Sequence, residues 1–116
     1  MRIREINPNE ALVYVPGLAN ITYTIFSELM DAESMGTNAV KEKYEMIKNG
    51  FSNNFVVFAE LLKIIDYRRT TCFEEGNLQC ADAYREIKED ADRWQKAHFN
   101  HNQRKYIRDA KKPRHK

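Results

Sequence analysis

The 116-residue chain is poor in the residues that make turns and cross-links, with four Gly, three Pro and two Cys. So few turn residues argue against a β-sandwich or barrel, which needs a turn after each short strand. Glycine-rich phosphate loops and G-x-S-x-G motifs are absent from the sequence, so it offers no signature of nucleophilic catalysis. The start, MRIREI, lacks the apolar core of a signal peptide, and we therefore expect a cytoplasmic protein.

The composition that remains is typical of a folded domain. Hydrophobic residues make up 42% of the chain and charged residues 31%, which argues against disorder. A chain of this length can bury a core without cross-links. We expect an all-α fold, a small bundle of about four helices, with a single helical domain over residues 1–108 and a basic tail over 109–116.

The most apolar stretch, Phe51–Tyr67, reads FSNNFVVFAELLKIIDY. Its apolar residues recur at helical spacing around most of the circumference, which predicts a central helix. Ser52, Asn53 or Asn54 can cap the start. Arg68 and Arg69 then fall at the predicted end, where cations suit the helix dipole. Charged residues interrupt the stretch, and it is short for a membrane span. The alternative is a buried strand over FVVF.

Three further helices are expected. One covers residues 18–30, the next follows a cap at Thr37 or Asn38 and stops at Asn49-Gly50, and the last runs from Leu78 to about Arg108. Before them, Asn7-Pro8-Asn9-Glu10 predicts a helical turn entering Ala11–Val15, although that segment could equally be a strand.

The last segment has a heptad seam, which predicts a face that is buried against something. The residues of this seam are Tyr84, Ile87, Ala91, Trp94, His98 and His101. As one helix it would be about 46 Å long, longer than its neighbours, at ~1.5 Å per residue. It therefore either breaks near Asn100–Asn102 or projects and pairs with a second copy. We predict that Tyr84, Ile87, Trp94, His98 and His101 contact a protein partner.

Two possible metal sites give weak patterns. Cys72 and Cys80 with His98 and His101 have C-x7-C and H-x2-H spacing, which misses the usual zinc spacing. In a reducing compartment the cysteines are not expected to form a disulfide and instead fill space near helix ends. The acidic residues Glu86, Glu89, Asp90 and Asp92 suggest an ion-paired solvent face rather than a site, with the expected pairs Glu89–Arg93, Asp92–Lys96 and Lys88–Asp92. We predict no metal and no cofactor.

Arg93-Trp-Gln-Lys-Ala-His98 has the form R-x4-H. This is similar to the RNase motif of HEPN-domain proteins, which are small helical bundles. The resemblance implies that Arg93 and His98, paired across a dimer, would activate a ribose 2′-hydroxyl and stabilise charge at the phosphate. It covers six of 116 residues, and Trp94 departs from the polar residue that is usual after the arginine.

Residues 104–116 contain seven Lys/Arg and one Asp, a charge of +6, which leaves −4 for the rest of a chain whose net charge is +2. A cation-rich segment of this kind can contact phosphates, and Tyr106 could stack on a base. A solubilising terminus is the plainer interpretation. The residues predicted to contact nucleic acid are Arg104, Lys105, Tyr106, Arg108, Lys111, Lys112, Arg114 and Lys116.

These patterns predict a non-enzymatic binding protein whose basic arm contacts nucleic acid or another acidic surface. The alternative is a regulator or adaptor, inhibitor-like, that docks an apolar and aromatic helix face on a protein partner. A HEPN-like RNase ranks third. No membrane association is expected.

Overall fold

The computed structural model describes residues 17–50 and 54–110. This part of the chain is helical and contains no strand, which confirms the all-α prediction. The predicted turn at Asn7–Glu10 and the residues of the tail after Ala110 lie outside the described residues. The helices are α1 (Leu18–Glu33), α2 (Thr37–Gly50), α3 (Phe55–Glu74), α4 (Leu78–His98) and α5 (His101–Ala110).

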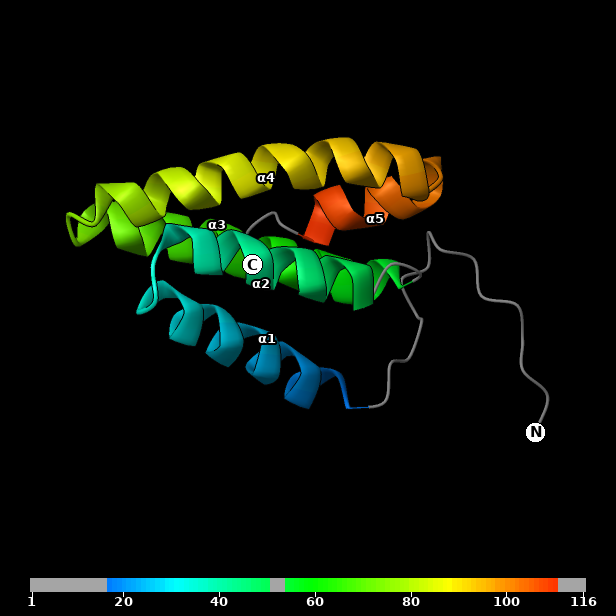
Figure 1. Cartoon of the computed structure of the whole chain (residues 1–116). Helices are drawn as coiled ribbons and strands as arrows, with labels where there is room; N and C mark the ends of the chain where they lie inside the picture. Colours follow the sequence, from blue (N-terminus) through cyan, green and yellow to red (C-terminus); the bar gives the residue numbers. More distant parts are fainter. Residues whose placement is uncertain (1–16, 51–53, 111–116) are drawn as a thin grey trace, which may run out of the picture.

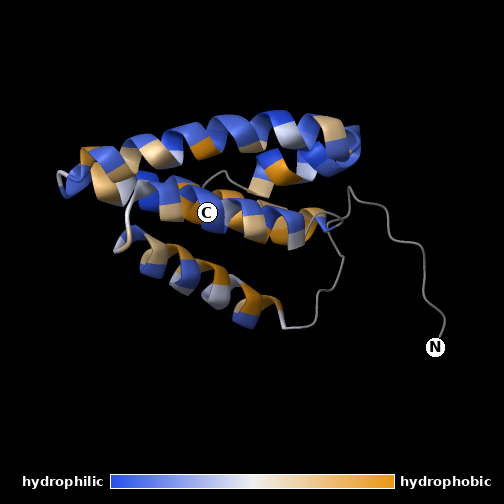
Figure 2. Cartoon of the chain, in the orientation of Figure 1, coloured by the Kyte–Doolittle hydropathy of each residue, from blue (hydrophilic) through white to orange (hydrophobic). Residues whose placement is uncertain are grey.

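Helix α3 is the centre of the bundle. It packs against α1, α4 and α5, and α2 packs against α1 and α4. Figure 1 shows α1 and α4 on opposite sides of the α2 and α3 pair. The first five residues of α3 are all buried, and so are Leu62 and Ile65 one and two turns further on. In Figure 2 the hydrophilic residues line the outer side of α4, away from this apolar centre.

Asn54 begins α3 and excludes the strand alternative. Its side-chain oxygen accepts hydrogen bonds from the backbone N–H of Val56 at 3.0 Å and of Val57 at 3.1 Å. These bonds satisfy two of the donors that a helix start leaves free. Of the three predicted cap residues, Asn54 is the one used.

The predicted end of α3 is wrong. The helix continues past Tyr67 to Glu74, so Arg68 lies inside it rather than at its end. Arg68 is 6% exposed and donates two hydrogen bonds to Glu33, at the end of α1. This arginine neutralises a carboxylate between helices and has no role at the helix dipole.

The long C-terminal segment breaks into two helices, which was one of the two predicted alternatives. Phe99 is extended and ends α4. Asn100 then accepts a hydrogen bond from the Gln103 N–H at 2.8 Å, while the Gln103 side chain accepts one from the Asn100 N–H at 3.0 Å. This reciprocal pair is a capping box that starts α5. Helix α5 folds back toward α3 (Figure 1). In this contact Tyr106 meets Phe55 edge-on.

The break raises the helix number in the described residues to five, where about four were expected. Helix α5 also extends two residues beyond the predicted domain boundary at residue 108. None of the helices in the described part of the chain has both the length and the apolar character that crossing a bilayer requires.

Candidate functional site

The predicted heptad seam is mostly covered inside the chain. Tyr84 and Ala91 are fully buried and Ile87 is 3% exposed. Tyr84 and Ile87 are therefore core residues, and a partner cannot contact them while the bundle is intact. Of the five predicted partner-binding residues, only Trp94, His98 and His101 retain exposed surface.

Trp94 anchors an aromatic cluster where α3, α4 and the α4–α5 connection meet. Its indole stacks on Phe58 with ring centroids 5.2 Å apart, and it meets Phe99 edge-on at 5.6 Å. On its other side it stacks on the His98 ring at 4.0 Å. This packing explains the tryptophan without catalysis.

Arg93 and His98 do not converge within one chain. Five residues at about 100° each place them roughly 140° apart around α4. Arg93 lies 3.8 Å from Asp90, and the His98 Nδ1 lies 2.9 Å from the Trp94 carbonyl oxygen. A site of the HEPN kind would need a second copy to unite them, and that hypothesis stays a prediction.

The basic residues of α5 form one wall of a groove against α4. The groove has a volume of about 300 Å³ and is lined by Asp92, Gln95, Lys96, Arg104, Ile107 and Arg108. Three cations and one carboxylate leave this lining with a formal charge of +2. We call this set of residues the α4–α5 groove.

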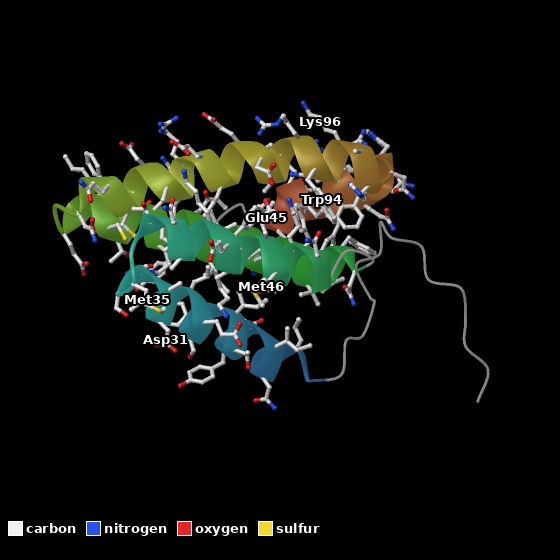
Figure 3. The ribbon with its side chains drawn as sticks, viewed as in Figure 1. Asp31, Met35, Glu45, Met46, Trp94 and Lys96 are labelled. Atoms are coloured by element: carbon white, nitrogen blue, oxygen red, sulfur yellow. The ribbon has the colours of Figure 1, made fainter. Side chains whose placement is uncertain are left out.

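Two hydrogen bonds position charged residues of the α4–α5 groove. The Arg104 guanidinium donates to the Phe99 carbonyl at 2.8 Å, which fixes it near the break. Asp92 accepts from Gln95 at 3.3 Å and does not form the ion pair expected with Lys96. Within residues 17–50 and 54–110, Lys96 has no ion-pair partner. Figure 3 shows Lys96 on the outer side of α4 and Trp94 on its inner side.

The other predicted nucleic-acid contacts divide into three groups. Lys105 and Arg108 both pair with Asp109, at 3.2 Å and 3.8 Å, and Arg108 also lines the groove. Tyr106 is half-buried against Phe55 at a centroid distance of 5.3 Å, so its ring is used in packing rather than presented to a base. Lys111, Lys112, Arg114 and Lys116 lie outside the described residues.

Three of the four acidic residues predicted to form an ion-paired face of α4 have ion pairs, but with partners other than those expected. Glu86 pairs with Lys41 of α2, and Glu89 pairs with Arg85 at 3.3 Å. Asp90 contacts Tyr44 and Lys48 of α2. These contacts agree with an ion-paired face. Those of Glu86 and Asp90 also connect α4 to α2.

Asp90 joins two buried side chains of α2. It accepts hydrogen bonds from Tyr44 at 2.7 Å and from Lys48 at 2.9 Å, and the Lys48 side chain is 6% exposed. Burial alone would raise the pKa of Asp90, but the hydrogen bonds from Lys48 and Tyr44 outweigh it and lower that pKa. Burial likewise opposes the charge of Lys48, whose pKa is nevertheless raised by Asp90 and Glu45.

We expect Asp90→Asn to destabilise the fold by about 1–3 kcal/mol, because it removes one of the two charged acceptors of a buried ammonium group and leaves only Glu45. The pKa of Asp90 is lower in the folded state, so its stabilising effect is present above its ordinary pKa and is lost as pH falls through the lowered value. The Asp90 side chain is 36% exposed, so solvent screening keeps this pH-dependent contribution to stability small. Urea unfolding between pH 7 and pH 3 measures it, and an equal pH dependence in wild type and variant would contradict it.

The four possible zinc ligands do not meet. Cys80 and His98 are 18 residues apart on α4, which is about 27 Å along a helix. Cys72 and Cys80 are close to each other, near Glu33. Sequence analysis did not identify Glu33 as a site residue, because no neighbouring residue distinguishes it from an ordinary surface glutamate. It also did not identify Lys96, which was expected to form an ion pair with Asp92. The sequence offered one clue to the α4–α5 groove. Lys96 and Arg108 lie twelve residues apart, on either side of the break predicted near Asn100–Asn102.

No protein-family model, no curated protein and no solved structure matches this chain, so its function has to be argued from the geometry above.

Proposed function

We propose that this chain is a non-enzymatic, cytoplasmic binding protein that contacts a nucleic-acid backbone through the α4–α5 groove. The observation that supports this most directly is the convergence of Lys96, Arg104 and Arg108 in one groove, whose lining includes a single carboxylate, that of Asp92. The carboxylate of Asp109 is outside this lining and pairs with Arg108 at 3.8 Å. Cations neutralise phosphates and release condensed counterions, which favours binding at low salt. The break at Phe99 brings these three cations together from two helices.

The basic residues that follow α5 extend the same charge in sequence. Lys111, Lys112, Arg114 and Lys116 come directly after the helix whose Arg104 and Arg108 line the groove. A continuous row of cations would contact successive phosphates without reading bases. The proposal is therefore for backbone contact with little sequence preference, and Tyr106 has no part in it.

We expect Arg108→Gln and Lys96→Gln each to weaken binding to a generic duplex. Each lost phosphate contact should lower the slope of log affinity against log salt by up to ~0.9. The measurement is fluorescence anisotropy with duplex DNA, duplex RNA and a single strand at several salt concentrations. Arg69→Gln is the matched control, because it makes the same chemical change at an exposed position of α3 outside the groove.

An equal slope for Arg108→Gln and Arg69→Gln would remove the groove from the proposal. No binding by the wild type at low salt would remove nucleic acid altogether. A protein partner bound with little salt dependence would instead favour the adaptor hypothesis. Such a partner, or a second copy of the chain, could contact Trp94, His98 and His101. These are the predicted partner-binding residues that keep exposed surface.

A further inference from the structure

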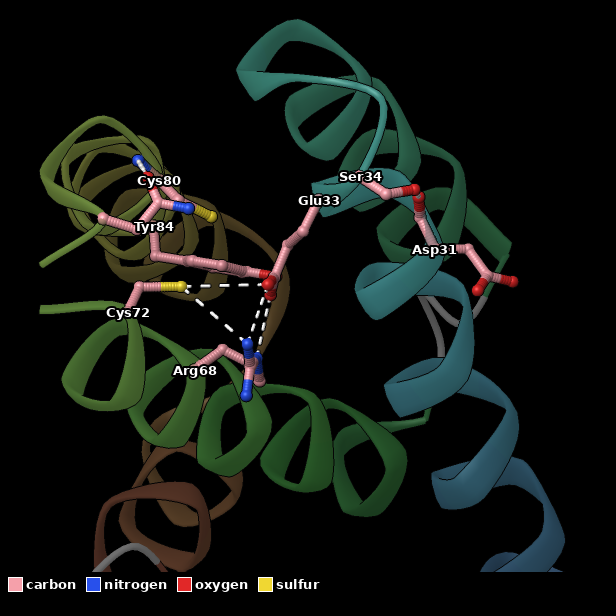
Figure 4. A network of polar contacts seen from close by, with 8 residues as sticks. Asp31, Glu33, Ser34, Arg68, Cys72, Cys80 and Tyr84 are labelled. Carbon is pink, nitrogen blue, oxygen red and sulfur yellow. Dashed lines mark hydrogen bonds and ion pairs between the residues drawn. The ribbon is translucent and has the colours of Figure 1, made fainter. Parts of the chain in front are cut away.

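Three helices bring soft and hard metal-ligand atoms together on the side of the bundle where α1 ends. Glu33 is the last residue of α1, Cys72 lies in the last turns of α3, and Cys80 lies in the first turn of α4. One carboxylate oxygen and the two sulfur atoms all lie within 4.8 Å of one another. Both cysteines are buried, at 1% and 3% exposure. Figure 4 shows the Glu33 side chain extending from α1 toward Cys72 and Tyr84.

The spacing of these atoms is close to that of a tetrahedral zinc site. Bonds of roughly 2.0 Å to oxygen and 2.3 Å to sulfur place ligand atoms about 3.5 Å apart for an oxygen and a sulfur, and about 3.8 Å apart for two sulfurs. Here the Glu33 Oε1 lies 3.8 Å from the Cys72 Sγ, and all three ligand atoms lie within 4.8 Å of one another. Shifts of about one ångström would close the ligand set around one ion.

The carboxylate is already held in the orientation that such a site needs. Its Oε2 accepts hydrogen bonds from the Tyr84 hydroxyl at 2.6 Å and from the Arg68 Nε at 2.8 Å. Its Oε1 accepts from the Arg68 Nη2 at 2.7 Å and faces the Cys72 sulfur (Figure 4). Ligating carboxylates are commonly fixed by outer hydrogen bonds of this kind.

Charge selects the class of ion. Each thiol is uncharged until it releases its proton to bind a metal as a thiolate. The buried cluster is neutral in that state, with Glu33 balanced by Arg68. Exchanging two thiol protons for one divalent cation keeps the cluster neutral, which suits an ion bound by both sulfur atoms.

We propose that Glu33, Cys72 and Cys80 form a binding site for a thiophilic divalent cation of the Zn²⁺ class. Arg68 offsets the single negative charge that two thiolates and a carboxylate leave around such an ion. The bound ion would join the ends of α1 and α3 to the start of α4. The site is independent of the α4–α5 groove, which lies at the other end of α4.

The test titrates full-length, fully reduced protein with Co²⁺ alone and then with Zn²⁺. We expect one Co²⁺ per chain, a thiolate-to-cobalt charge-transfer band, and loss of that band as Zn²⁺ displaces it. Cys72→Ser and Cys80→Ser keep the size of the side chain and should each weaken binding by more than the roughly 10–100-fold that an outer hydrogen bond contributes. Zn²⁺ should raise the unfolding temperature of the wild type and not that of either variant.

Glu75→Gln is the control for adventitious binding, because Glu75 is an exposed carboxylate just after α3 and should have no effect. Circular dichroism checks that each serine variant is folded. Absence of the charge-transfer band in folded, reduced wild type would overturn the proposal. So would Co²⁺ binding that persists unchanged in a folded Cys72→Ser, Cys80→Ser double variant.

Discussion

Replacing Glu33 with alanine should lower the free energy of unfolding by about 3–5 kcal/mol, the range for breaking one side of a buried ion pair. The side chains of Arg68 and Glu33 are 7% and 11% exposed, so solvent cannot replace the lost carboxylate. Arg68 would lose two hydrogen bonds and the Tyr84 hydroxyl one. The guanidinium charge would then be buried without a partner, which is the costly part of the change.

The measurement is urea unfolding at neutral pH with a chelator present, so that metal binding does not contribute. Glu28→Ala is the matched control, because Glu28 lies on the same helix and its ion pair with Lys43 spans 3.7 Å at the surface. We expect that control to change stability by no more than about 0.5 kcal/mol. A Glu33→Ala effect as small as the control would show that the Arg68 pair is not a determinant of stability.

Arg68→Leu together with Glu33→Leu is the informative double variant. Replacing a buried ion pair by apolar residues of similar volume is often neutral or stabilising, because neither charge remains to be desolvated. We therefore expect the double variant to be more stable than Glu33→Ala alone. The single variants Glu33→Leu and Arg68→Leu complete the double-mutant cycle. If their effects on the free energy of unfolding simply added up in the double variant, direct coupling between Glu33 and Arg68 would be contradicted.

Leu62→Ala should destabilise the fold by about 2–5 kcal/mol. Leu62 is fully buried in the middle of α3, the helix that contacts α1, α4 and α5. Truncation removes apolar contacts and leaves a cavity that several helices would have to move together to close. Ile65→Ala and Phe55→Ala, also at buried positions of α3, should fall in the same range.

Lys63→Ala tests the same helix at the neighbouring position. The Lys63 side chain is 44% exposed and pairs with Glu60 one turn away. Its loss should change stability by no more than about 0.5 kcal/mol. Denaturant unfolding of both variants gives the comparison, and a Leu62→Ala effect near that of Lys63→Ala would mean that α3 is not the centre of the bundle.

Local sequence by itself determined the helical class of this protein and the place of its central helix. The periodic apolar residues of α3 and the capping asparagine at residue 54 act through neighbours within one or two turns. The break after His98 was one of two predicted alternatives, the other being a projecting helix. Both followed from length, because one unbroken helix would have been longer than the helices it packs against. Those properties depend on spacing along the chain, which a sequence displays directly.

Only the tertiary structure decided which charged residues are buried and with whom. Arg68 looked like a terminal cation and Cys72 like filler near a helix end, yet both face Glu33, which is 35 and 39 residues away from them. Lys48 and Asp90 pair across 42 residues in the same way. Such contacts depend on the rotation and axial position of each helix, and a shift of one residue turns a side chain by about 100°. Helical periodicity indicates which face is apolar, but it cannot align the polar groups of three helices to within hydrogen-bonding distance.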